Sequence, residues 1–272
     1  FRKKMDELVS VYKDGSFGLN MKYFDYTWAD YMVSGAMERH FGFPKRVPES
    51  KIQKHHEDIA AALQAKLEEL EVRLLVSAYK RYKTRNLCLA GGVALNSVFN
   101  GKIIRKTPFR NVFIPPDPGD GGGAMGAAFY VHTRFSKKPI KDLNPYLGPD
   151  FTLSEIKEVL KKKDLSFKLY RDRKKLIDKT VEYLSKKKVV AWFQGRMEWG
   201  PRALGARSIL ADASEAKMKD VINAKVKKRE MFRPFAPVIL EDKVSDYFRG
   251  FSKGVKRLGK YMLLVLPFKE KG

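Results

Sequence analysis

The sequence contains little of the chemistry that commonly cross-links small folds or binds metals, with one cysteine and four histidines in 272 residues. A single cysteine excludes an internal disulfide framework and suits a reducing compartment. Because Cys88 lies between apolar neighbours, we expect it to be a small buried hydrophobe. His55 and His56 are adjacent, so they lie on different faces of a helix and lack the spacing that brings two imidazoles to one metal.

Long apolar runs are also absent. No stretch approaches the roughly 18 residues that a membrane span needs, and the start has no signal-peptide core. We therefore expect a soluble cytoplasmic protein with no membrane partner. The chain opens on Phe1 and closes on an apolar run followed at once by residues 269–272. These ends suggest a piece of a longer polypeptide, although processing would also remove an initiator methionine.

Acidic residues are few beside basic ones. Lys and Arg number 55 against 31 Asp and Glu, for a formal net charge of +24. Such a surface attracts anions, but composition does not distinguish nucleic acid, an anionic membrane or phosphorylated small molecules, and scattered lysines also suit a merely solvated surface. With 44% hydrophobic residues, the chain can bury real cores, which excludes a disordered tail.

Hydrophobic periodicity predicts an α/β protein of two domains. After an irregular, aromatic-rich start over residues 1–50, we expect two strand–glycine–helix units whose loops gather at one edge of a sheet. The expected strands are 86–90, 111–115 and 189–193, the last one buried, and the expected helices are 53–82, 94–105, 124–132, 156–163 and 176–184. Prolines and glycines between 135 and 149 predict a linker, with the domain boundary between residues 138 and 139.

Glycine-rich turns follow the first two strands. Gly91 and Gly92 would let the backbone approach a phosphate or ribose oxygen, and Asn96 would add a side-chain contact. An ordinary tight turn needs the same residues. In the second turn, Asp120 lies among glycines at the mouth of a helix, where its carboxylate is either a divalent-metal ligand or an ordinary helix cap.

Residues 193–210 combine arginines with glycines and a proline. The planar guanidinium matches phosphate and carboxylate, so arginines on a rigid turn are arranged in advance for an anion. The arginines of this segment are Arg196, Arg202 and Arg207.

A second basic segment covers residues 225–240. It is either an exposed basic loop or a group of cations that converges with the first segment around several phosphates, as phosphoryl or adenylyl transfer requires. Its candidate residues are Lys227, Arg229 and Arg233.

Four motifs occur here in the same order as in the O-carbamoyltransferases of nodulation-factor and antibiotic biosynthesis, and the sequence resembles that family over nearly its whole length. The motifs are Gly91–Asn96, Gly119–Ala128, Gly195–Gly205 and Arg229–Pro237. The resemblance implies the C-terminal part of an actin-like ATPase (Kae1-like) domain at residues 1–138. It also implies an incomplete α/β domain similar to the threonylcarbamoyl-adenylate synthase (YrdC-like) at residues 139–272.

The resemblance also implies an activity. The carbamoyl group of carbamoyl phosphate would pass, through an ATP-derived carbamoyl adenylate, to a hydroxyl of a small-molecule or glycan acceptor. The implied cofactors are ATP and a divalent metal, iron or magnesium. The implied catalytic residues are Lys227, Arg229 and Arg233; the implied substrate and ATP contacts are Arg196, Arg202, Arg207, Ser208, Gly91, Gly92 and Asn96; the implied metal ligand is Asp120.

This sequence departs from the family pattern in two ways. None of its four histidines forms the His-x-x-x-His motif of the family's larger domain, so the metal site is incomplete in this chain. Ala206 stands where an asparagine is usual. The activity of the chain by itself is therefore left open, as are the acceptor and the oligomeric state.

Two other readings compete. An actin-like ATPase or sugar kinase explains the two glycine turns but leaves the arginine-rich half unused. A basic nucleic-acid-binding module explains the charge, but the aromatic residues are not interleaved with Lys and Arg in stacking patterns, and no helix-turn-helix or zinc-finger spacing occurs. We rank the transferase first and expect no nucleic-acid partner.

Overall fold

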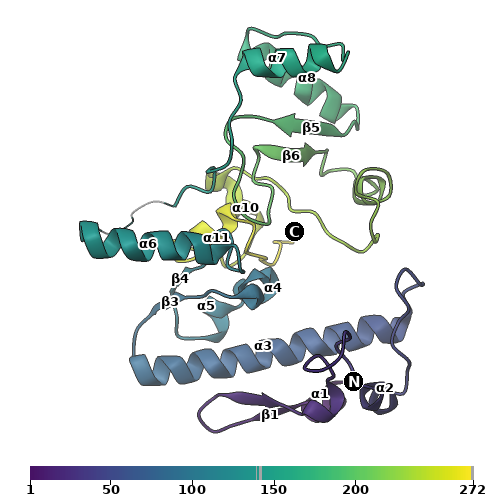
Figure 1. Ribbon diagram of the computed structural model, residues 1–272, viewed down its shortest axis with the longest axis vertical. Coiled ribbons are helices and arrows are strands. Elements are labelled where there is room, and N and C mark those ends of the chain that lie inside the picture. The colour runs from purple at the N-terminus through teal and green to yellow at the C-terminus, as the bar shows by residue number, and fades with distance from the viewer. Residues whose placement is uncertain (139, 141–142, 271–272) are drawn as a thin grey trace. The chain divides into compact units, whose positions relative to one another are not determined.

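A computed structural model describes residues 1–138, 140 and 143–270 (Figure 1). The chain forms two compact units. The first contains residues 1–87 and 101–111, and the second contains 88–100 and 112–272. The predicted boundary adjoins residue 139, which lies outside the described residues, so that boundary stays a prediction.

The first unit is built on one long helix, α3 (Lys54–Tyr82), which confirms the helix expected at 53–82. The helix ends where Lys83 takes a left-handed conformation with φ of +54°. We expected the residues before this helix to be irregular. They instead form short regular elements whose apolar side chains pack together. These elements are α1 (Arg2–Asp6), β1 (Val9–Val11), β2 (Phe17–Leu19), η1 (Met21–Tyr23) and α2 (Gly35–Phe41), and their core is Met5, Leu8, Tyr23 and Phe41, with Ala62 of α3.

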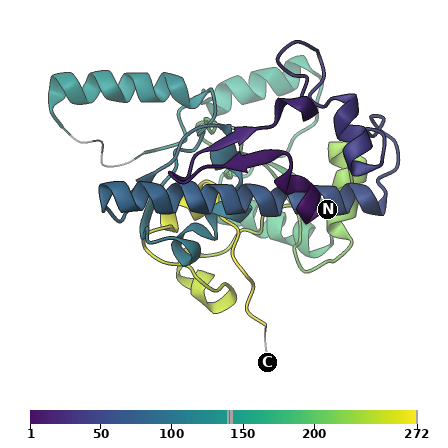
Figure 2. The same cartoon turned by 90° about the horizontal axis from the view of Figure 1, so that it is seen from below.

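Strands β1 and β2 form an antiparallel hairpin beside α3 (Figure 2). At its turn Gly15 has φ of +88°, and a Cβ there would lie 2.7 Å from the Cβ of Ser77 on α3. The Ser77 hydroxyl also donates a hydrogen bond to the backbone oxygen of Asp14. Only glycine fits both the backbone conformation and the close approach.

Strands β3 (Asn86–Cys88) and β4 (Asn111–Phe113) pair, as the two strand–glycine–helix units predict. The loops that follow them meet, because the Gly91 N–H donates to the Pro118 carbonyl at 2.7 Å. Cys88 is exposed rather than buried, since only one face of this two-stranded sheet is covered.

The prediction of a single helix at 94–105 is wrong. The chain instead forms η2 (Gly92–Leu95), α4 (Ser97–Asn100) and α5 (Ile103–Lys106). Asn96 ends the first turn and starts the next, because its Oδ1 accepts from the Phe99 N–H at 3.2 Å. The buried Asn100 amide bonds the carbonyls of Ala94 and Leu263 at 2.8 and 3.0 Å, which anchors α4 to the C-terminal segment.

The second unit continues through short helices and one antiparallel strand pair. Its elements are α6 (Gly122–Ser136), α7 (Leu153–Lys162), α8 (Arg173–Ser185), β5 (Val190–Phe193), β6 (Arg207–Leu210), α9 (Met218–Val221), η3 (Ile222–Lys227), η4 (Glu241–Lys243), α10 (Val244–Tyr247) and α11 (Lys256–Lys260). Thr152 and Glu155 cap α7 reciprocally. Helices mixed with small sheets are consistent with the α/β class.

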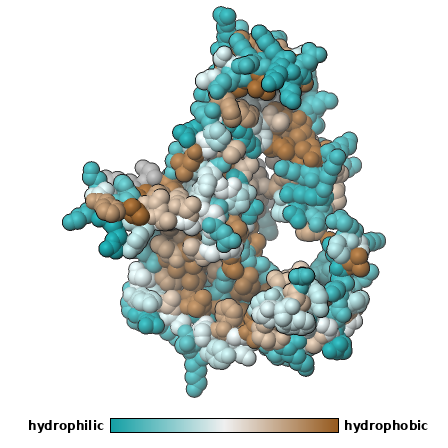
Figure 3. Space-filling model, viewed as in Figure 1, coloured by the Kyte–Doolittle hydropathy of each residue, from teal (hydrophilic) through white to brown (hydrophobic). Residues whose placement is uncertain are grey.

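Strand β5 pairs with β6 and contacts α8, but its side chains alternate between half-buried and exposed. The expectation of a fully buried strand is therefore wrong, because one face of this two-stranded sheet is uncovered. Figure 3 shows hydrophilic side chains over α7 and α8, at the top of the view. None of the helices in the described residues is both long and apolar enough to cross a membrane.

Candidate functional site

Two loops of the second unit, residues 91–92 and 198–205, each contact a third loop, residues 116–122, and we call the three together the three-loop junction. Besides the Gly91–Pro118 hydrogen bond, Gly200 approaches the second loop closely. A Cβ on Gly200 would lie 3.2 Å from the Pro116 carbonyl oxygen, and its φ is +114°. The meeting of the first two loops was expected from the sequence, whereas the approach of the third loop to the second at Gly200 was not.

The first loop leaves its backbone open. Gly91 has φ of +100°, and a side-chain carbon on Gly91 or Gly92 would meet nothing within 4 Å. The expected approach of a ligand to this backbone stays a prediction. Asn96 uses its Oδ1 to start α4, so at least part of its side chain serves the fold rather than a ligand.

The second loop is organised by Asp117, which sequence reasoning missed. Its Oδ1 accepts from the Gly119 N–H at 3.1 Å. Side-chain carbons on Gly121 and Gly122 would overlap the Asp117 carboxylate and carbonyl oxygens, respectively. These glycines are therefore needed for packing, and the Gly-Asp pattern could have shown only that a turn is present.

Asp120 is exposed just before α6. Among the described residues, no three His, Cys, Asp or Glu side chains come close enough to hold a metal ion. One carboxylate does not supply the several oxygens that a divalent cation needs. Asp120 therefore does not complete a metal site in the described part of the chain, and we assign no step to a metal. Its role as a ligand stays a prediction.

The third loop is held by Glu198, a buried carboxylate that sequence reasoning also missed. Its Oε1 accepts the backbone N–H groups of Leu204, Ala206 and Arg207 at 2.8, 2.6 and 3.1 Å. Burial raises the pKa of the Glu198 carboxyl, but the backbone hydrogen bonds outweigh this and hold the pKa below its usual value. The carboxylate is therefore ionised at neutral pH. The only feature of the sequence that could have indicated this role of Glu198 is its position between two glycines, Gly195 and Gly200.

The third loop with its flanks, residues 195–208, contains three arginines, and we call this segment the arginine loop. The three arginines differ in their surroundings. Arg196 donates to the carbonyls of Leu147 and Gly148, and Arg207 donates to those of Gln194 and Gly195. The Nε of Arg202 is buried and has no hydrogen-bond partner among the described residues. An unmatched buried guanidinium donor is costly, so it favours an acceptor supplied from outside the chain.

Ser208 also serves the loop, because its Oγ accepts from the Gly205 N–H at 2.9 Å. None of the three arginines forms an ion pair with a carboxylate of the described residues. The three guanidinium groups are thus not paired with carboxylates, although the ionised Glu198 lies in the same loop and the Arg207 guanidinium lies 3.4 Å from the centre of the Phe193 ring. Guanidinium groups without a carboxylate partner favour a bound anion.

The second basic segment surrounds Asn223, a fully buried side chain at the start of η3. Its Oδ1 accepts from the Nε of Arg229 at 2.8 Å, and its Nδ2 donates to the Arg233 carbonyl at 2.9 Å. The Arg229 guanidinium lies 4.8 Å from the centre of the Phe235 ring, and Arg233 pairs with Glu230 at 2.8 Å. Lys227 is exposed at the end of η3.

The predicted residues therefore fall into two groups. One belongs to the three-loop junction and its flanks, and the other surrounds Asn223. The first group holds Gly91, Gly92, Asn96, Asp120, Arg196, Arg202, Arg207 and Ser208; the second holds Lys227, Arg229 and Arg233. That all six predicted cations face one cavity stays a prediction.

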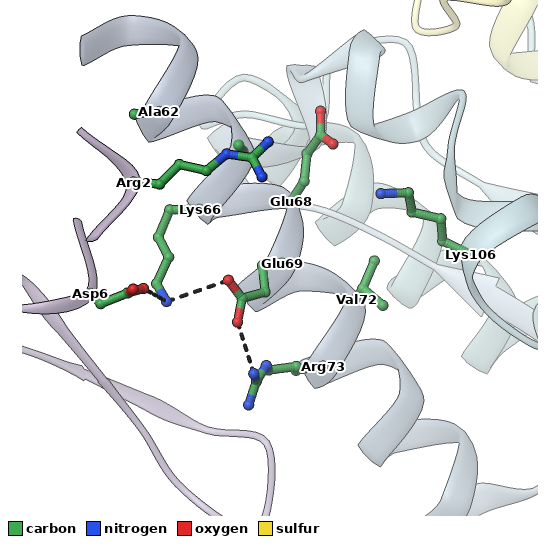
Figure 4. Close-up of a pocket in the computed structure, with 10 residues that line it drawn as sticks. Arg2, Asp6, Ala62, Lys66, Glu68, Glu69, Val72, Arg73 and Lys106 are labelled. Atoms are coloured by element: carbon green, nitrogen blue, oxygen red, sulfur yellow. Dashed lines mark hydrogen bonds and ion pairs between the residues drawn. The ribbon is translucent and has the colours of Figure 1, made fainter. Parts of the chain in front are cut away.

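A cavity of about 550 Å³ lies in the first unit, apart from these two groups, between α3 and its neighbours (Figure 4). Lys66 bridges Asp6 and Glu69 across it, at 2.7 and 3.5 Å, and Glu69 also pairs with Arg73. Its charged residues largely satisfy one another, and none of the site residues predicted from the sequence lines it.

Comparison with known proteins identifies the family. Two family models match the chain: Carbamoyltransferase N-terminus over residues 2–129 and Carbamoyltransferase C-terminus over residues 181–272. The chain belongs to the carbamoyltransferase family.

Three relatives align with most of the chain. An uncharacterized protein of Synechocystis is 43% identical over 274 residues, which cover 98% of this chain and 44% of that protein. Nodulation protein NolO of Bradyrhizobium diazoefficiens is 40% identical over 218 residues, 79% of this chain and 39% of NolO. Nodulation protein U of Sinorhizobium fredii is 36% identical over 195 residues, 71% of this chain and 33% of that protein. The chain thus spans less than half the length of each.

Proposed function

We propose that the protein containing this chain transfers a carbamoyl group from carbamoyl phosphate, through an ATP-derived carbamoyl adenylate, to a hydroxyl of a small-molecule or glycan acceptor. Family membership supports the class of reaction. The observation that carries the choice of substrates is the Nε of Arg202, which is buried and has no hydrogen-bond partner among the described residues. Arg202 lies in the loop that contacts the second glycine turn at Gly200, and the first glycine turn is open at Gly91 and Gly92.

The reaction balances as follows. Water releases phosphate from carbamoyl phosphate, and a carbamate oxygen then bonds the α-phosphorus of ATP while pyrophosphate leaves. The acceptor oxygen next bonds the carbamoyl carbon, its proton is lost, and AMP leaves. Both phosphorus-centred steps concentrate negative charge, which positioned guanidinium groups stabilise.

The residues divide accordingly. Arg202 and Arg207 would bind phosphoryl oxygens of the substrates, and the Gly91–Gly92 backbone would contact ATP. Around Asn223, Arg229 and Lys227 would stabilise the charge that develops on the α-phosphate. A cytoplasmic location, and the absence of nucleic-acid and membrane partners, stay predictions from the sequence.

Pyrophosphate release tests this proposal in the full-length protein. We expect release from ATP only when carbamoyl phosphate is present, and Arg229→Ala should reduce it by about 100-fold or more, the usual effect of removing a transition-state donor. Lys175→Ala, at an exposed lysine of α8, is the control and should match the unaltered protein. Pyrophosphate release that is indifferent to carbamoyl phosphate would contradict the proposal, and release of phosphate and ADP from ATP alone would instead favour a simple ATPase.

A further inference from the structure

Residues 145–149, which we call the strap, lie along the arginine loop, at the end of the segment where the sequence predicts a linker. The Trp199 N–H donates to the Pro145 carbonyl at 2.6 Å, the Gly148 N–H to that of Met197 at 2.9 Å, and the Met197 N–H to that of Pro149 at 3.1 Å. The strap lies between the stretches that the two family models match, at 2–129 and 181–272.

Side chains reinforce this pairing. Arg196 donates to both Leu147 and Gly148 carbonyls, at 2.9 and 3.0 Å. A Cβ on Gly148 would lie 2.8 Å from the Cβ of Met197, so the strap and the loop touch too closely for a larger residue at this position. The backbone bonds and the lack of space together fix the register between the two segments.

The peptide of Leu204 is held from both sides. Its carbonyl accepts from the hydroxyl of Tyr146, on the strap, at 2.7 Å, and its N–H donates to Glu198 at 2.8 Å. Glu198 also binds the N–H groups of Ala206 and Arg207. One buried carboxylate and one phenol thus hold the backbone from Leu204 to Arg207, together with Ser208 and Gln194, which bond Gly205 and Ala206.

We infer that Tyr146 and Glu198 are positioning residues of the arginine site, which hold the loop so that Arg202 and Arg207 are placed for a phosphate-bearing substrate. This inference rests on the proposed function. Neither side chain needs to touch the substrate. Each acts through the loop backbone, so its loss should weaken substrate binding more than it weakens the fold.

Tyr146→Phe gives the cleaner test, because it removes one hydroxyl and leaves the ring. In the full-length protein we expect the KM for carbamoyl phosphate to rise about five- to tenfold, the effect of one lost hydrogen bond, with kcat changed less than KM. Amide hydrogen exchange of residues 202–208, followed by mass spectrometry, should be faster. Tyr183→Phe is the matched control, since this exposed tyrosine lies on α8, and it should change neither quantity.

Glu198 is tested by a graded pair. Glu198→Gln keeps an acceptor oxygen without the charge, and Glu198→Ala removes both, so exchange over 202–208 and KM should rise in the order wild type, Gln, Ala. If Tyr146→Phe and Glu198→Gln leave exchange and KM at the wild-type values, the inference is overturned. If exchange rises as expected while wild-type turnover ignores carbamoyl phosphate, the positioning of the loop stands and the proposed function fails.

Discussion

Asp117 shows how a residue can matter through the backbone around it. The sequence drew attention to Asp120, whereas the side chain that organises the glycine turn is three positions earlier. Asp117 bonds the Gly119 N–H, and its own atoms occupy the space where side chains of Gly121 and Gly122 would stand. Spacing along the chain does not reveal which of two neighbouring aspartates turns inward.

The adjacent glycines Gly122 and Gly123 provide a matched comparison. We expect Gly122→Ala to lower the free energy of unfolding by about 1–3 kcal/mol, because its methyl group would overlap the Asp117 carbonyl oxygen. Gly123→Ala meets nothing within 4 Å and lies in α6, so it should raise stability by up to about 1 kcal/mol. Urea denaturation of both variants measures the difference, and equal effects would contradict this account.

Sequence reasoning identified the arginines but missed the residues that hold them. Guanidinium groups among glycines indicate an anion site by their own chemistry. Glu198, Tyr146 and Asn223 act by bonding backbone groups or arginine side chains that only the fold brings near them. Their roles could not be predicted, because the partners are defined by tertiary structure rather than by residue type.

Among the elements, long periodic segments were predictable and short ones were not. The helix at α3 follows from its apolar spacing and its alanines, and the α7 cap follows from Thr152 and Glu155. The segment 92–106 breaks into short helical turns because the buried Asn100 side chain donates hydrogen bonds to the Ala94 and Leu263 carbonyls. One of these contacts spans a separation of 163 residues, which no local pattern encodes.

Helix α3 also contains a buried acid whose environment makes stability depend on pH. The Oε2 of Glu71 is buried without a partner among the described residues. Burial, with a smaller contribution from the nearby Glu68 carboxylate, raises the pKa of Glu71 from 4.5 to about 7. Glu68 itself faces Lys102 and Lys106 from the neighbouring segment. Because the folded-state pKa is raised, stability is lost as pH rises from 4.5 to 7, and the full penalty is present above pH 7.

Glu71→Gln should remove this penalty. We expect the free energy of unfolding to rise by about 1–2 kcal/mol at pH 8, after allowance for partial exposure, with little change at pH 4.5. Urea titrations at the two pH values make the comparison, with Glu57→Gln at the exposed start of α3 as the control. The same gain at both pH values would show that packing, and not ionisation, is responsible.

At the scale of the whole molecule, the excess of positive charge acts on stability as well as on ligands. With a formal net charge of +24, the basic side chains repel one another more strongly in the compact folded state than in the extended unfolded chain. Added salt screens this repulsion, since the Debye length shortens from about 30 Å at 0.01 M to about 8 Å at 0.15 M.

We therefore expect the melting temperature to rise between about 0.01 and 0.15 M NaCl, by a few degrees. Calorimetry at fixed pH measures the shift, with sucrose as an uncharged additive for comparison. A melting temperature that falls with NaCl would mean that ion pairs such as Lys102–Glu68 contribute more to stability than the net repulsion removes.

Exposure of the only thiol has a practical consequence for studying this protein. Cys88 lies in β3, three residues before Gly91, and the sequence contains no other cysteine. A maleimide fluorophore would therefore attach once within these 272 residues, without prior mutagenesis, next to the turn that we propose contacts ATP. Its emission would report ATP titrations directly, and oxidation in storage would yield covalently linked pairs of chains unless a reductant is present.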